Sequence, residues 1–235
     1  MKNIIADVRR SLTDNIDENT VKTTQNFFKE KINFYGVKIP IVNKISKASF
    51  DSMEDRSKNT VFALCEELWR SGYTEESYIA CNWSYYIRKE YEPDDMRTFK
   101  HWVDNYVNNW ASCDTLCNHS VGTLIEVYPE CVVDLKKWTD SRNKWMKRAA
   151  AVSLIIPARK GLFLNELFDI ADVLMPDEED LVQKGYGWML KAASEAHRQE
   201  VFDFVMSRKT CMKRTALRYA IEKMPEDMKE RAMAK

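Results

Sequence analysis

The chain has 235 residues, of which 45% are hydrophobic, and its 36 basic residues balance 36 acidic ones. Six glycines and six prolines are too few for the many tight turns of an all-β protein, and no apolar run is long enough to span a membrane. The N-terminal apolar run is too short for a signal peptide, so we expect the six cysteines to be free thiols in a cytoplasmic protein.

Nearly every segment has the periodicity of an amphipathic helix, and strand-type alternation occurs nowhere at useful length. Helix breaks are predicted at residues 36–40, at Ser71-Gly72, and at Pro93, Pro129, Pro157, Pro176 and Pro225. These breaks divide the chain into many short helices of roughly 10–15 residues. Two apolar lines illustrate the pattern: Trp145, Ala149, Val152 and Ile156, and then Val182, Tyr186, Met189 and Ala193. We therefore predict an all-α protein.

The stretch NWASCDTLCNH (109–119) places Trp110 and Asp114 four residues apart, on one face of a helix. An inward face would make the Asp costly, and an outward face would leave the Trp without packing. A groove that needs both an aromatic wall and a negative charge resolves the conflict. Cys113, Cys117 and His119 do not have a standard zinc spacing and no second pair follows, so we predict no metal and no Cys–His nucleophile.

A weak internal repeat connects WMKRAAAVSLI, LVQKGYGWML and CMKRTALRYAI. Arg148, Lys184 and Arg214 are then 36 and 30 residues apart, and steps back of 34 and 35 residues reach Asp114 and Ile79. Periods of this size in a helical chain indicate an α-solenoid, in which the equivalent helix of each repeat lines one concave surface. We expect residues 1–235 to form a single domain of this kind.

Charge alternates along the second half of the chain. Residues 136–160 hold eight basic side chains and one acidic one, residues 166–180 hold seven acidic and no basic ones, and residues 208–218 hold five basic and no acidic ones. This alternation suggests one basic and one acidic face, although each cluster alone is also typical of solvated helix surface.

A basic groove is predicted from the helix faces that point away from the core. Lys184, Trp188 and Lys191 share one such line, and cations beside an indole suit a nucleic-acid backbone. Lys144 with Arg148, and Arg214 with Arg218, repeat the pattern on neighbouring helices. The other tryptophans are expected in the core: Trp69, Trp83, Trp102, Trp138 and Trp145.

Asp114 is the anomaly in such a groove, because a negative charge repels phosphate. It is useful only where a cation develops, and cleavage of an N-glycosidic bond produces an oxocarbenium-like sugar. A carboxylate beside that sugar stabilises the charge and orients the attacking water.

The stretches FFKEKINFYGVKIP, NNWASCDTL, NKWMKRAAAVSL, VQKGYGWMLKAA and KRTALRYAI resemble, in this order, the AlkD-type DNA alkylation-repair glycosylases built from HEAT-like repeats. The resemblance runs from about residue 20 to residue 222. It implies excision of cationic N3- and N7-alkylated purines, notably 3-methyladenine and 7-methylguanine, from duplex DNA, without a metal or cofactor and without flipping the base into a pocket. It also implies a monomer without a membrane partner, in a prokaryotic type of cytoplasm, associated with the nucleoid.

By the same resemblance, Asp114 would stabilise the sugar cation and position water, Trp110 and Trp188 would cradle the deoxyribose, and Arg148 would bind phosphate. Further DNA contacts are expected from Lys144, Lys184, Lys191, Lys213, Arg214, Lys38 and Phe27. Phe27 replaces a Tyr that faces the lesion in relatives, Lys38-Ile39 replaces a Gln-Thr pair, and Lys191 replaces an Arg.

Two other functions remain open at this point. The chain could be a helical-repeat protein that binds distorted or branched DNA without catalysis, in which case Asp114 would gain it nothing. A protein-binding HEAT scaffold would carry an apolar or acidic groove in place of a basic one.

Overall fold

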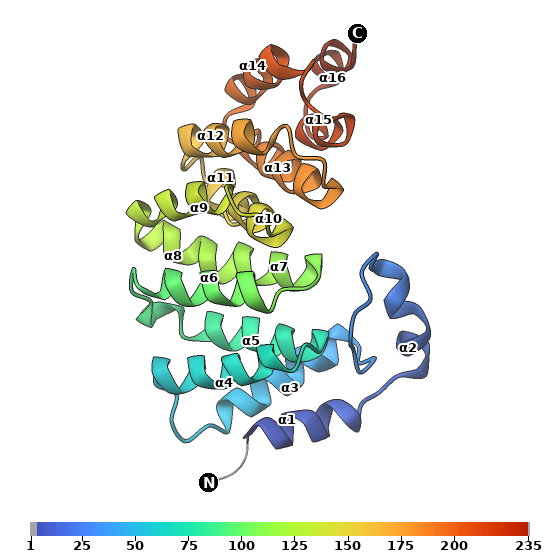
Figure 1. Ribbon diagram of the computed structural model, residues 1–235, viewed down its shortest axis with the longest axis vertical. Coiled ribbons are helices and arrows are strands. Elements are labelled where there is room, and N and C mark those ends of the chain that lie inside the picture. The colour runs from blue at the N-terminus through green and yellow to red at the C-terminus, as the bar shows by residue number, and fades with distance from the viewer. Residues whose placement is uncertain (1–3, 235) are drawn as a thin grey trace. The chain divides into compact units, whose positions relative to one another are not determined.

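A computed structural model describes residues 4–234, and all regular elements within them are helices (Figure 1). A lone β-bridge joins Asn33 to Tyr73 in this part of the chain. The chain divides into two compact units, Met1–Leu116 and Cys117–Lys235. The predicted all-α helical-repeat fold is confirmed, whereas the single domain stays a prediction. Across the described residues, no helix combines the length and apolar character needed to cross a bilayer.

Unit 1 consists of short helices. They are α1 (Ile4–Thr13), α2 (Glu18–Thr24), η1 (Gln25–Phe27), α3 (Ile39–Asp51), α4 (Lys58–Arg70), α5 (Thr74–Tyr86), η2 (Arg88–Glu90), α6 (Asp95–Asn105) and α7 (Trp110–Leu116). Helix α5 packs against α3, α4 and α7, which makes it the centre of the unit. The indole of Trp83 is fully buried there and donates to the carbonyl of Ser46 at 2.9 Å.

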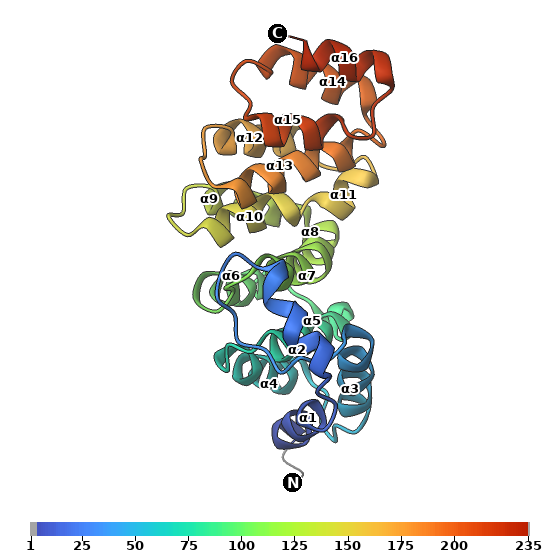
Figure 2. The same ribbon diagram turned by 90° about the vertical axis from the view of Figure 1, so that its right-hand side faces the viewer.

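The segment Asp17–Lys38, here called the arm, carries α2 and η1, neither of which has a buried residue. Helix α2 lies beside the stacked α3, α4 and α5 in Figure 1 and in front of α5 in Figure 2. Asp17 caps α2 by accepting the N–H of Thr20 at 2.8 Å. Because the buried apolar residues of the arm are few, chiefly Ile32 and Val37, its position depends largely on polar contacts to the rest of the unit.

Unit 2 is built in the same way. Its elements are η3, a π-helical turn (Cys117–Val121), α8 (Gly122–Val127), η4 (Pro129–Cys131), α9 (Val132–Trp138), α10 (Lys144–Val152), α11 (Ile155–Arg159), α12 (Leu164–Leu174), α13 (Asp180–Ala193), α14 (Arg198–Arg208), α15 (Arg214–Ile221) and α16 (Glu226–Met233). Helix α13 packs against α10, α11, α12 and α15.

Close approach of α13 and α15 explains Gly187. A Cβ at this position would lie 2.7 Å from the Cβ of Tyr219 and 2.8 Å from the carbonyl oxygen of Ala216. The predicted apolar line of this helix is confirmed, because Val182, Tyr186, Met189 and Ala193 are all fully buried.

The remaining core predictions are also largely confirmed. Trp69, Trp83, Trp102, Trp138 and Trp145 are all buried, as are Ala149 and Val152, while Ile156 is half-buried. The six cysteines are free, and all but Cys211 are buried.

Helix lengths and one break differ from the prediction. The α-helices have 5 to 14 residues. Pro157 does not break a helix but lies in the first turn of α11, where its missing N–H would have no partner in any case. The break precedes it, at Ser153-Leu154.

Three helices share the predicted repeat register. Asp114, Arg148 and Lys184 are each the fifth residue of their helix, in α7, α10 and α13. Ile79 is the sixth residue of α5, whereas Arg214 is the first of α15.

Candidate functional site

Helix α7 presents Trp110 and Asp114 one turn apart on one face. Asn109, itself buried, starts the helix, since its side-chain oxygen accepts the N–H of Ser112 at 2.9 Å. Trp110 is 36% exposed and Asp114 is half-buried. The face is therefore neither core nor open surface, as the i, i+4 spacing of a Trp and an Asp predicts.

Two neighbours from the arm hold the indole of Trp110. Its Nε1 donates to the carbonyl oxygen of Phe27 at 3.3 Å. Phe28 stacks on it, with 5.6 Å between ring centroids and 25° between planes. Within the unit, the Nε1 edge of the indole is therefore hydrogen-bonded and one of its faces is covered by Phe28.

A pocket of about 290 Å³ lies between the arm and the first turns of α3, α5 and α7. Its walls are mainly apolar and aromatic, and include Phe27, Phe28, Phe34, Tyr78, Trp110 and Ala111. Such a lining suits a flat or apolar group.

Tyr78 lines this pocket and lies close enough to Asp114 for the two side chains to interact electrostatically. Burial raises the pKa of the Tyr78 phenol to about 12, with further contributions from the nearby Cys81 and the negative charge of Asp114. The phenol is therefore neutral at physiological pH, and the Asp114 carboxylate lies close enough to affect its ionisation.

Buried carboxylates of α5 hold the far end of the arm. Glu75 accepts the backbone N–H groups of Tyr35, Gly36 and Val37 at 3.0, 2.8 and 3.1 Å. Glu76 accepts the Tyr35 hydroxyl at 2.6 Å and a bidentate pair of hydrogen bonds from the guanidinium of Arg9, Nε to Oε1 at 3.2 Å and Nη2 to Oε2 at 3.1 Å.

Sequence reasoning missed the contributions of Phe28, Glu75 and Tyr78. Two acidic residues in the first turn of a helix look like ordinary dipole partners. The only sequence signal for the anchored arm was the turn around Gly36. The backbone of Gly36 has φ of +91° and packs against Val21 of α2.

In unit 2, Arg148 is buried, with 5% of its surface exposed. Its Nη1 donates to the carbonyl oxygen of Leu181, and its aliphatic stem lies against Gly185 of α13. The phosphate contact predicted for Arg148 stays a prediction. Trp188 is half-buried on the same α13 helix, between Lys184 and Lys191 in the sequence.

Most of the cations predicted to bind DNA have a carboxylate partner of their own. The pairs are Lys38–Asp17 at 2.9 Å, Lys184–Asp180 at 2.8 Å, Lys191–Glu222 at 2.9 Å and Lys213–Glu178 at 2.5 Å. Arg214 donates weakly to the carbonyl of Met233 at 3.5 Å, and the Lys144 ammonium lies 5.0 Å from the ring centroid of Trp145.

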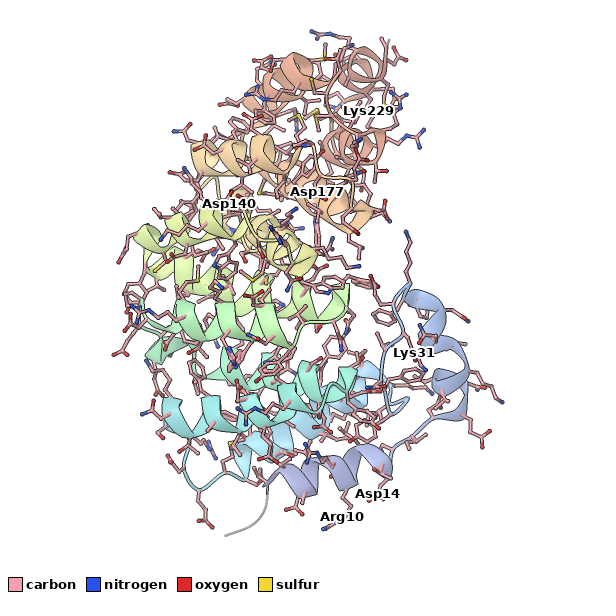
Figure 3. The ribbon with its side chains drawn as sticks, in the orientation of Figure 1. Arg10, Asp14, Lys31, Asp140, Asp177 and Lys229 are labelled. Carbon is pink, nitrogen blue, oxygen red and sulfur yellow. The ribbon has the colours of Figure 1, made fainter. Side chains whose placement is uncertain are left out.

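These pairs also give the charge alternation a structural origin. The acidic stretch contacts both basic stretches, through Lys136–Asp169, Lys147–Asp177 and Arg208–Asp172 (Asp177 is labelled in Figure 3). The more exposed of these pairs, such as Lys136–Asp169 and Lys213–Glu178, contribute at most about 1 kcal/mol each, so their lysines can readily exchange the carboxylate for another anion.

Comparison with known proteins gives the family. No curated protein sequence matches the chain. A solved structure described as a predicted DNA alkylation repair enzyme from Enterococcus faecalis shares the fold, with a TM-score of 0.79 and 17% identity over 90% of this chain and 97% of that one. The family model of the DNA alkylation repair enzyme matches residues 8–224. The chain therefore belongs to the DNA alkylation repair enzyme family.

Proposed function

We propose that the chain is a monofunctional DNA glycosylase that hydrolyses the N-glycosidic bond of N3- and N7-alkylated purines in duplex DNA, without flipping the base into a pocket. The observation that carries this proposal is the pairing of a partly exposed Trp110 with a half-buried Asp114 on one helix face, in a member of an alkylation-repair family.

The chemistry needs only one carboxylate. An alkylated purine already carries a positive charge, so the electron pair of the C1′–N bond leaves with the base and cancels that charge. The sugar is left as an oxocarbenium-like cation, which the Asp114 carboxylate stabilises. Water then adds to C1′ and loses its proton to solvent by way of Asp114. The products are the free base and an abasic site, and no lysine nucleophile is assigned that would cleave the strand.

The partly exposed indole of Trp110 would contact the deoxyribose of the damaged nucleotide. In unit 2 we propose Trp188 and Arg148 as contacts to the sugar-phosphate backbone. We propose Lys144, Lys184, Lys191, Lys213 and Arg214 as phosphate contacts, with Lys38 as a further one in unit 1. Each paired lysine would exchange its carboxylate for a phosphate on binding.

The test is release of 3-methyladenine and 7-methylguanine from methylated duplex DNA by the wild type and by Asp114→Asn, with DNA affinity measured in parallel. We expect the variant to bind at least as well and to release base about 100-fold more slowly, a loss typical for removal of one group that stabilises developing charge. The matched control is Asp104→Asn, an exposed carboxylate paired with Lys100 on α6. If neither wild type nor variant releases base while both bind, the chain is a non-catalytic DNA-binding protein.

A further inference from the structure

Three exposed apolar side chains of unit 1 line the pocket beside Trp110. Phe27 is the most exposed large hydrophobic residue in residues 4–234, at 70%, and Ile39 at 46% and Trp110 at 36% line the same pocket. Single exposed apolar residues are ordinary, but a group of them around one pocket marks an interaction surface.

The backbone that carries Phe27 is firmly held although its ring is not packed. Phe27 ends η1, its carbonyl accepts the indole N–H of Trp110, and the next residue stacks on that indole. The side chain of Gln25 donates to the carbonyls of Phe28 and Glu30 at 3.3 and 2.9 Å. A ring presented to solvent on such a support is pre-organised for a contact outside the molecule.

The lysines of the arm place positive charge near the exposed ring of Phe27, a combination that can bind a polyanion with an apolar interior. The arm holds four exposed lysines (22, 29, 31 and 38) against three acidic residues (17, 18 and 30), and Asp17 pairs with Lys38 (Lys31 is labelled in Figure 3). Duplex DNA matches this arrangement, because its phosphates meet the cations while its stacked bases can accept an apolar ring.

We propose that Phe27 is a wedge that enters the base stack of duplex DNA beside the alkylated nucleotide. The position beside the lesion rests on the proposed function, through the contact between Trp110 and the damaged nucleotide. Insertion would kink the duplex at that step, so steps that unstack easily, TA and CA, should be preferred as neighbours of the lesion.

The experiment uses the full chain and a duplex with 2-aminopurine, whose fluorescence rises on unstacking, next to a 7-methylguanine. The damaged nucleotide carries a 2′-fluoro group, which destabilises the sugar cation and so keeps the base attached. Saturating protein is used throughout, so that occupancy is equal. We expect wild type and Phe27→Tyr to raise the fluorescence severalfold, and Phe27→Ala to abolish most of the rise. Affinity should weaken by about 5- to 150-fold in Phe27→Ala, the range for loss of one stacked aromatic.

The matched control is Val173→Ala, which truncates a 52% exposed apolar side chain on α12. It should change neither fluorescence nor affinity. A rise in Phe27→Ala as large as that of wild type at saturation overturns the wedge, whatever the base-release assay gives. Conversely, a wild type that unstacks DNA through Phe27 but releases no base from methylated DNA supports the wedge and refutes the glycosylase. Thermal melts should be unchanged in Phe27→Ala, since the ring is mostly exposed.

Discussion

Replacement of Glu75 by Ala should release the arm from unit 1. The carboxylate is 4% exposed and accepts three backbone N–H groups, of Tyr35, Gly36 and Val37. Two of these donors, Gly36 and Val37, are on buried residues. A buried donor left without an acceptor costs about 1–3 kcal/mol, so the two together cost about 2–6 kcal/mol. The helices α2 and η1 bury no residue, so the apolar contacts that oppose this loss are those of Ile32 and Val37 and the stacking of Phe28 on Trp110.

The assay is limited trypsin digestion, with cleavage at Lys22, Lys29 and Lys31 followed by mass spectrometry. When opening is fast, cleavage follows the population of the open form, and 2 kcal/mol corresponds to about a 30-fold faster rate. The matched control is Glu67→Ala, which removes a 55% exposed carboxylate 3.7 Å from Arg9 and should cost at most about 1 kcal/mol. Equal cleavage rates in Glu75→Ala and Glu67→Ala would refute the reasoning.

Three further predictions concern packing, pH and salt. Gly187→Ala should lower the free energy of unfolding of unit 2 by about 1–3 kcal/mol in denaturant titration, whereas Gly185→Ala, whose nearest contact would be 3.4 Å, should be tolerated. The hydrogen bonds of Asp17 with Lys38 and then Thr20 lower its pKa to about 2, so its stabilisation of α2 should be complete above pH about 4 and lost as the pH falls toward 2. NMR shifts of residues 18–24 report that transition, which Asp17→Asn should lack. Glu178→Gln should tighten DNA binding at low salt by freeing its lysine partner, and equal affinity of variant and wild type in a fluorescence-anisotropy titration would contradict this.

Short-range patterns carried most of what the sequence could predict. The 3.6-residue period placed Val182, Tyr186 and Met189 in the core because helical spacing alone decides which side chains share a face. The same spacing predicted the common face of Trp110 and Asp114. Proline was a poorer guide, since Pro157 is compatible with the first turn of a helix as well as with a break.

Contacts between distant segments could not be predicted in this way. Glu75 meets its partners about 40 residues earlier in the chain, and Phe28 meets Trp110 across more than 80. Nothing in the local sequence of either segment specifies its partner. The ion pairs of Lys191 and Lys213 span 31 and 35 residues, close to the repeat period. A count of charges along the chain therefore shows separate basic and acidic clusters, although the fold pairs their side chains with one another.

Those ion pairs bear on how a repair protein searches a genome. Undamaged duplex vastly outnumbers lesions, and every unproductive stop delays the encounter with damage. When Lys191 or Lys213 contacts a phosphate, it must first leave Glu222 or Glu178, so the net gain is smaller than for an unpartnered lysine. If these lysines contact phosphates as proposed, we expect a short dwell time on intact DNA and a long one only at sites where Trp110 and Asp114 of α7 also contact the damaged nucleotide.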